Sequence, residues 1–162
     1  MTNWCVVVAD GARARIFVLE PGGGRAGDPS LLEKADLANA GYSARGADAP
    51  HMRTERNTNR QTGPMHAVGE KREQHRLEVE RRFGVRIAER VAEVVKGWNE
   101  GSIVLVADPR LLGLMREMLR EAVKSEITLK ELAKDYTRLS ATELHEHLAS
   151  NGLIPMRRRN GA

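Results

Sequence analysis

The start of the fold is decided by the stretch Trp4-Cys-Val-Val-Val-Ala-Asp-Gly-Ala-Arg-Ala-Arg-Ile-Phe-Val-Leu19, in which an Asp-Gly pair separates two largely apolar runs. An Asp-Gly pair in this position favours a type I′ turn, whose twist matches that of paired strands. We therefore predict a β-hairpin with Asp10-Gly11 as a two-residue loop, Ala9 opposite Ala12, and Trp4 opposite Phe17 at the open end.

The two strands of this hairpin differ in polarity. The first run is apolar on both faces, which is typical of a central strand. The second run alternates, so that one face carries Ala14, Ile16 and Val18 and the other carries Arg13, Arg15 and Phe17. We expect the second face to be more polar and to offer basic side chains to a ligand.

The remainder of the chain predicts alternating strands and helices. Residues 30–37 favour a third strand, with a short helix as the alternative. A helix is indicated by apolar residues three, four or six positions apart, namely Leu77, Phe83, Ile87, Val91, Val94 and Trp98. Residues 102–107 read as an apolar strand, and Asp108-Pro109 supplies an N-cap and a first-turn proline for the next helix. A last strand is expected at residues 126–132, and Ser140-Ala-Thr-Glu143 matches the capping box of a final helix.

The domain organisation follows from length and composition. A chain of 162 residues with 41% apolar content supports one hydrophobic core. We expect a single domain over residues 1–152, a long mobile polar insert over residues 40–70, and a basic tail over residues 153–162. The lone cysteine, Cys5, lies inside the first strand, where a buried thiol is expected.

The order β-β-β-α-β-α-β-α predicts a mixed α/β sheet of the ribonuclease H-like kind, with strands one, four and five parallel. Asp10, Asp108 and Asp135 then lie at the carboxyl edge of those strands, where open α/β sheets bind ligands. Three carboxylates at one edge could hold two divalent cations and hydrolyse a phosphodiester bond. Each aspartate also has a structural role in a turn or as an N-cap, so a metal-dependent phosphodiesterase is an alternative hypothesis.

The sequence indicates no other metal-binding or cofactor-binding site. His145 and His147 are two positions apart on a predicted helix, so they point to different faces and are expected at the surface. The glycine run at residues 22–24 fits neither a dinucleotide-binding motif nor a phosphate loop. We expect no cofactor and no zinc site.

Positive charge is concentrated in the insert and the helix start that follows it, where the basic residues are Arg45, Arg53, Arg56, Arg60, Lys71, Arg72 and Arg76. The planar fork of arginine suits phosphate oxygens, which indicates RNA as a partner. Acidic residues dilute the run and aromatic content is only 4%, so stacking platforms for bases are not evident. A solvated loop without a partner explains the same charges equally well.

Three segments resemble the bacterial host-attachment protein family. They are Asp10-Gly-Ala-Arg-Ala-Arg-Ile-Phe17, Ile103-Val-Leu-Val-Ala-Asp-Pro-Arg-Leu-Leu-Gly113 and Lys134-Asp-Tyr-Thr137. The chain departs from the family at Ser43-Ala-Arg-Gly-Ala-Asp-Ala-Pro50, where an Asp-Arg-Pro-Gly-Arg-like run is common. The family is similar to the middle domain of archaeal and eukaryotic peptide-release factors, which implies a ribonuclease H-like fold and a ribosomal role. Peptide release itself is not expected, because Gly22-Gly-Gly24 lacks the glutamine of the catalytic tip.

These observations converge on a non-catalytic cytoplasmic binding protein. No signal peptide and no run of membrane-spanning length is recognised. We expect contact with ribosome or RNA through the insert from Arg45 to Arg76 and through the Arg13/Arg15 face. The alternatives are the phosphodiesterase and a protein-interaction or oligomerisation domain that docks through its sheet edge. As an oligomerisation domain, the protein would form a homo-oligomer.

Overall fold

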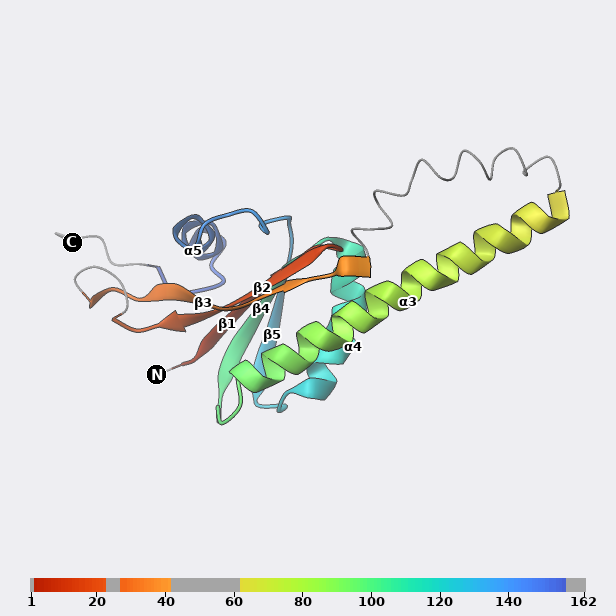
Figure 1. Ribbon diagram of the computed structural model, residues 1–162. Coiled ribbons are helices and arrows are strands. Elements are labelled where there is room, and N and C mark those ends of the chain that lie inside the picture. The colour runs from red at the N-terminus through yellow and green to blue at the C-terminus, as the bar shows by residue number, and fades with distance from the viewer. Residues whose placement is uncertain (1, 23–26, 42–61, 157–162) are drawn as a thin grey trace.

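The computed structural model describes residues 2–22, 27–41 and 62–156. The chain runs in order through β1 (Trp4–Ala9), β2 (Arg13–Glu20), β3 (Ser30–Ala38), α3 (Thr62–Val94), β4 (Gly101–Ala107), α4 (Pro109–Ala122), β5 (Ile127–Ala133) and α5 (Ala141–Ser150). This is the predicted order of strands and helices (Figure 1). Residues 30–38 form a strand and not the alternative short helix.

A single five-stranded sheet organises these elements in the order β3-β2-β1-β4-β5. Strand β2 is antiparallel to both β1 and β3, whereas β1, β4 and β5 are mutually parallel. The predicted parallel set is therefore confirmed. Strand β1 lies at the centre of the sheet, as its apolar sequence indicates.

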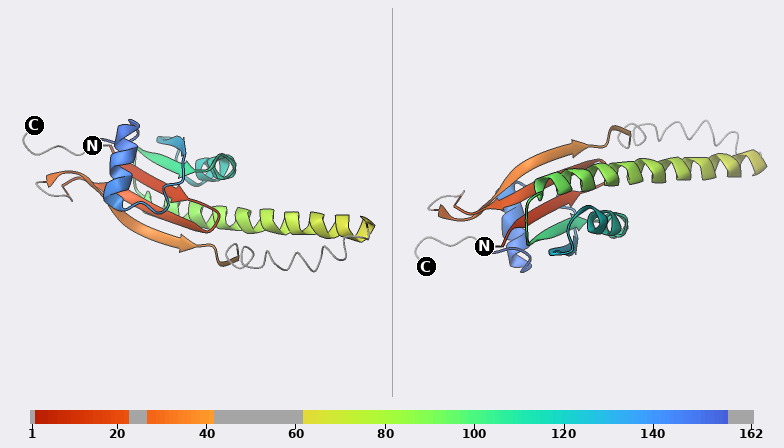
Figure 2. Two further views of the ribbon diagram at one scale, coloured as in Figure 1. Left: turned by 90° about the horizontal axis from the view of Figure 1, so that it is seen from above. Right: turned by 90° about the horizontal axis from the view of Figure 1, so that it is seen from below.

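Helices cover both faces of the sheet. Helices α3 and α4 lie on one face and α5 lies on the other (Figures 1 and 2). Alternate residues of β1 serve the two sides, because Cys5 and Val7 pack with α3 and α4 while Val6 and Val8 pack with α5. The two hydrophobic clusters are thus separated by the sheet itself.

The hairpin loop is wider than the sequence predicts. Ala9 pairs with Ala14 and Val6 with Phe17, so four residues separate the last paired positions, and the predicted Ala9–Ala12 and Trp4–Phe17 pairs are wrong. Gly11 also lacks the positive φ that a type I′ turn requires. The Asp10 carboxylate instead accepts hydrogen bonds from the backbone N–H groups of Ala12 and Arg13, both at 2.8 Å, which stabilises a longer turn.

Helix α3 begins earlier than expected and ends at Val94, so Trp98 lies beyond the helix and not on its predicted stripe. It starts at Thr62, so it includes the end of the predicted insert, while residues 42–61 lie outside the described part of the chain. Phe83, Ile87 and Val91 are buried as predicted, but Leu77 is 48% exposed, and its assignment to the apolar stripe is wrong. Figure 1 shows the reason, since the first half of α3 extends beyond the sheet and none of the described strands or helices covers it there.

Helix α3 comes close to α4 at Gly84. A Cβ atom at Gly84 would lie 2.9 Å from the Met118 sulfur and 3.1 Å from the Met115 sulfur. The absence of a side chain therefore permits the close approach of the two helices. Further along, Gly97 has a φ of +88°, which allows the chain to turn after the end of the helix.

The C-terminal segment returns to the core. His145 is 1% exposed, and its Nε2 atom lies 2.8 Å from the Pro155 carbonyl oxygen, so its predicted surface position is wrong. Ile154 is buried in the cluster beneath α5, two residues beyond the boundary predicted for the domain. Cys5 is fully buried, as expected, and burial raises the pKa of its thiol to about 12. Among the described residues, no helix is both long and apolar enough to cross a bilayer.

Candidate functional site

The carboxyl ends of the parallel strands meet at one edge, and the three predicted aspartates follow those strands. Asp10 and Asp135 are linked by Thr137, whose Oγ1 atom lies 2.7 Å from Asp135 Oδ1 and 3.3 Å from Asp10 Oδ2. Thr137 is 2% exposed, so the threonine that makes this link is buried, whereas Asp135 is exposed. Two of the three aspartates are therefore brought together by a hydroxyl group.

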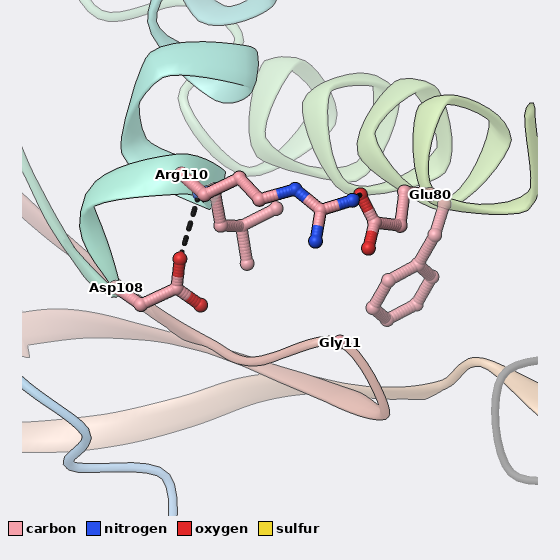
Figure 3. A pocket seen from close by; sticks show the side chains of 6 residues that line it. Gly11, Glu80, Asp108 and Arg110 are labelled. Atoms are coloured by element: carbon pink, nitrogen blue, oxygen red, sulfur yellow. Dashed lines mark hydrogen bonds and ion pairs between the residues drawn. The ribbon is translucent and has the colours of Figure 1, made fainter. Parts of the chain in front are cut away.

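Asp108 has a separate role at the start of α4. Its Oδ1 atom accepts a hydrogen bond from the backbone N–H of Leu111 at 2.9 Å, which makes it the N-cap that the sequence predicts (Figure 3). Within the described residues, no three His, Cys, Asp or Glu side chains form a group that could hold a metal ion. The structure thus gives each aspartate a hydrogen-bonding role and does not assemble the three into one cluster.

A small pocket of about 110 Å³ opens beside this edge, between α3, α4 and the hairpin loop. It is lined by Gly11, Glu80, Phe83, Asp108, Arg110 and Leu111 (Figure 3). Arg110 Nη2 lies 2.8 Å from Glu80 Oε2, and the Glu80 side chain is only 14% exposed. Because Glu80 balances the charge of Arg110 and Asp108 adds a carboxylate, the pocket offers no net positive charge to a phosphate.

Arg15 is a structural anchor that sequence reasoning missed. Its Nη1 atom donates to the carbonyl oxygens of Thr137 and Leu139, at 3.1 and 2.6 Å, and its fork binds the Glu33 carboxylate at 2.7 and 3.3 Å. The guanidinium carbon lies 4.8 Å from the centre of the Phe17 ring, and the side chain is 12% exposed. Arg15 therefore fastens the loop between β5 and α5 to the hairpin. The acidic Glu33 on the neighbouring strand was the available signal.

Arg13, two residues earlier, is at the surface. Its Nε and Nη2 atoms donate hydrogen bonds to the two carboxylate oxygens of Asp36, at 2.9 and 2.6 Å. The side chains of Arg13 and Asp36 are 44% and 47% exposed. The hydrogen bond from Arg13 lowers the pKa of Asp36, and the same contact raises the pKa of Arg13. The predicted basic face thus divides into one partly buried arginine, Arg15, and one exposed arginine, Arg13, each paired with a carboxylate on β3.

The other predicted phosphate-binding residues belong to the insert and to α3. Arg45, Arg53, Arg56 and Arg60 lie outside the described residues. Lys71, Arg72 and Arg76 lie on the half of α3 that extends past the sheet (Figure 1). Arg76 binds Glu73 one turn earlier on the helix, at 2.6 and 2.8 Å. Their role in RNA binding stays a prediction.

The two segments that meet at the Arg15 anchor also carry the resemblance noted in the sequence. The Asp10 to Phe17 stretch supplies the turn and Arg15, while the Lys134 to Thr137 stretch supplies Asp135 and the Thr137 hydroxyl. These two stretches are 117 residues apart in sequence, yet they form one hydrogen-bonded junction. The residues that carry the resemblance therefore contact one another in the structure.

Comparison with known proteins places the chain in a family. Residues 5–148 match the family model described as a protein required for attachment to host cells. No curated protein shows significant sequence similarity to the chain. Among solved structures, the Ppx/GppA phosphatase of Aquifex aeolicus, in its type II variant, is similar with a TM-score of 0.38 and 7% identity. That match covers 81% of this chain and 36% of the phosphatase, so the chain spans about a third of its length. Because the family model covers most of the sequence, the chain belongs to the family of proteins required for attachment to host cells.

Proposed function

We propose that this member of the host-attachment family is a non-catalytic binding protein whose partner is the ribosome or RNA. The observation that carries the proposal is the first half of α3, which extends beyond the sheet (Figure 2). None of residues 69–82 is buried, so this length of helix contributes no fully buried side chain to the core. It carries Lys71, Arg72 and Arg76, and it continues a segment rich in arginine.

The charge of this region supports a phosphate-rich partner. Residues 42–76 contain seven basic and four acidic residues. The ion pair between Arg76 and Glu73 is half exposed on both sides. Exposed pairs of this kind contribute little to stability, so a phosphate could replace the carboxylate at small cost. Arg13 is 44% exposed and stays a candidate contact, whereas we leave Arg15 out because Glu33 and the carbonyl oxygens of Thr137 and Leu139 hold it.

The fold is consistent with this role. The strand order β3-β2-β1-β4-β5, with an antiparallel β2 and three parallel strands, supports a ribonuclease H-like arrangement. That arrangement supports in turn the resemblance to the middle domain of peptide-release factors. We propose a binding role without peptide release, in the cytoplasm where ribosomes are found.

A binding role also agrees with the carboxyl edge of the sheet. The carboxylates of Asp10, Asp108 and Asp135 all accept hydrogen bonds that hold local structure. The phosphodiesterase hypothesis predicts cleavage of RNA that requires Mg²⁺ or Mn²⁺ and disappears in Asp10→Asn. Absence of such cleavage in the unmodified protein would end that hypothesis.

The proposal is tested by the salt dependence of RNA binding. We would titrate ribosomal RNA with the full chain and with a triple variant in which Arg53, Arg56 and Arg60 are changed to Gln. Loss of three phosphate contacts should reduce the slope of log K against log salt by about 2. A matched control changes Arg90, Arg120 and Arg138 to Gln, which removes the same charge from exposed positions elsewhere. Equal slopes for both variants would contradict the proposal.

A further inference from the structure

Strand β5 is an open edge of the sheet. It lies at the end of the strand order, next to β4 alone. An edge strand directs the N–H and C=O groups of alternate residues away from its neighbour, where another strand can bind them. The Leu132 carbonyl oxygen accepts a hydrogen bond from the Lys134 N–H at 3.1 Å, whereas between residues 128 and 131 no described side chain or loop binds these groups.

The opposite edge strand, β3, is protected against such pairing. Ile16 pairs with Ala35 and Phe17 with Glu33, which leaves Lys34 as an extra residue in β3. A bulge that carries a lysine is a common device for blocking an edge. The two edges of this sheet therefore differ, and β3 is the guarded one.

The charged residues of β5 do not guard its edge. Lys130 Nζ lies 4.8 Å from the centre of the Trp4 ring, over the sheet. The Glu131 carboxylate accepts two hydrogen bonds from Arg116 of α4, at 2.6 and 2.7 Å, on the other face of the sheet. Both side chains are held by neighbours within the domain, so the backbone between them is accessible.

A hollow of about 300 Å³ lies beside this edge, between the end of α4 and the start of β5. Its lining combines aliphatic side chains with two cations and contains no carboxylate: Leu119, Arg120, Val123, Lys124, Ser125, Ile127 and Leu129. Arg120 lies 3.9 Å from Glu117, at the limit of an ion pair, and Lys124 has no ion pair with a described residue. The hollow is therefore suited to an aliphatic group next to a negative charge.

A second copy of the chain fits this edge poorly. Two β5 strands related by a two-fold axis at Lys130 or Glu131 would place like charges directly opposite each other, which is destabilising. An axis at Leu129 would bring Arg120 and Lys124 of both copies together around the hollow. The charge pattern favours a different, acidic occupant.

We propose that the β5 edge binds an extended peptide segment of a partner protein, which adds a strand to the sheet. An aliphatic side chain of the segment enters the hollow, and a carboxylate two residues away binds Arg120 and Lys124. The two side chains must be two residues apart because alternate residues of a strand share a face. This interaction is independent of the RNA-binding surface on α3.

The test uses a labelled probe peptide, acetyl-Thr-Val-Thr-Glu-Thr-Val-Thr-amide, and the full chain. We expect it to bind at least about tenfold more tightly than the same peptide with Lys in place of Glu, because two cations face that position. The double variant Arg120→Glu, Lys124→Glu should reverse this preference. The control Arg90→Glu, Lys96→Glu makes the same charge change on exposed residues of α3 and the turn after it, and should leave the preference unchanged.

Backbone pairing is tested with two N-methylated versions of the probe. One is methylated at the Val and Glu amides and the other at the internal Thr amides, so each blocks one edge of the peptide. Strand addition predicts that only one of them loses binding. Equal binding of both, an unchanged preference in the double variant, or no binding of the Glu peptide at millimolar concentration would overturn the proposal. A dimer of the protein that the peptide dissociates would also overturn it, in favour of a second copy.

Discussion

The partly buried arginine of the hairpin, Arg15, provides the sharpest test of how this domain is held together. The change Arg15→Met keeps an apolar stem against Phe17 but removes the guanidinium group. The carbonyl oxygens of Thr137 and Leu139 then lose their charged donor, and Glu33 loses its partner. The matched control is Arg13→Met on the same strand. Arg13 donates two hydrogen bonds to the Asp36 carboxylate at the surface and, among the described residues, binds no carbonyl oxygen.

The structure predicts a different loss of unfolding free energy for each of the two variants. A buried polar group left without a partner costs about 1–3 kcal/mol, and two carbonyls are affected, so with partial entry of water we expect Arg15→Met to lose about 3 kcal/mol. An exposed ion pair contributes only about 0.2–1 kcal/mol, which is the loss expected for Arg13→Met. For a domain of this size, the larger loss corresponds to a fall in Tm of about 6–12 °C.

Denaturation in urea measures both free energies of unfolding directly. The two variants should share the same m-value, since both retain the fold, and should differ in midpoint. If Arg15→Met and Arg13→Met lose the same free energy to within about 0.5 kcal/mol, burial and carbonyl contacts do not make Arg15 an anchor, and the reasoning is refuted.

Three further predictions concern a helix cap, an ion pair and the cysteine. Asp108→Ala should lower the free energy of unfolding by about 1 kcal/mol because α4 loses its N-cap, whereas Asp108→Asn, which can still accept the bond, should lose much less; thermal unfolding distinguishes them. The hydrogen bond from Arg116 lowers the pKa of Glu131 below its ordinary value of 4.5. The pair therefore stabilises the fold fully above that pH and loses its effect as pH falls through the lower folded value, so Glu131→Gln should flatten the acid side of a stability-versus-pH curve. The Cys5 thiol, with its pKa raised to about 12 by burial, should react slowly with a thiol reagent at pH 8 in the folded protein and rapidly in urea; fast labelling without urea would contradict its burial.

Sequence patterns predicted the elements of this fold well because periodicity and capping act locally. The strands, the order of elements and the caps at Asp108 and Ser140 follow from residues close together in the chain. The hairpin shows where this reasoning fails. The Asp10 side chain stabilises a four-residue loop where an Asp-Gly pair favours two, yet the resulting shift of two positions keeps side chains on their predicted faces.

Positions that depend on distant partners could not be predicted. His145 is buried because residues 153–155 return across α5, and nothing in the helix sequence indicates that return. Leu77 has the correct spacing for burial but lies where α3 has passed the edge of the sheet. Alternation groups Arg15 with Arg13, and only the tertiary contacts of the loop after β5 distinguish the partly buried Arg15 from the exposed Arg13.

The central claim is that the basic insert and the exposed half of α3 bind the ribosome or RNA. Its most direct test is co-sedimentation of the tagged full chain with ribosomes through a sucrose gradient, at low and at high salt, with and without ribonuclease. The account predicts that the protein migrates with ribosomal particles at low salt and returns to the top at high salt, after ribonuclease, or in the Arg53, Arg56 and Arg60 to Gln variant. A protein that stays at the top under every condition, or whose migration is unchanged by salt and by the three substitutions, would contradict the claim.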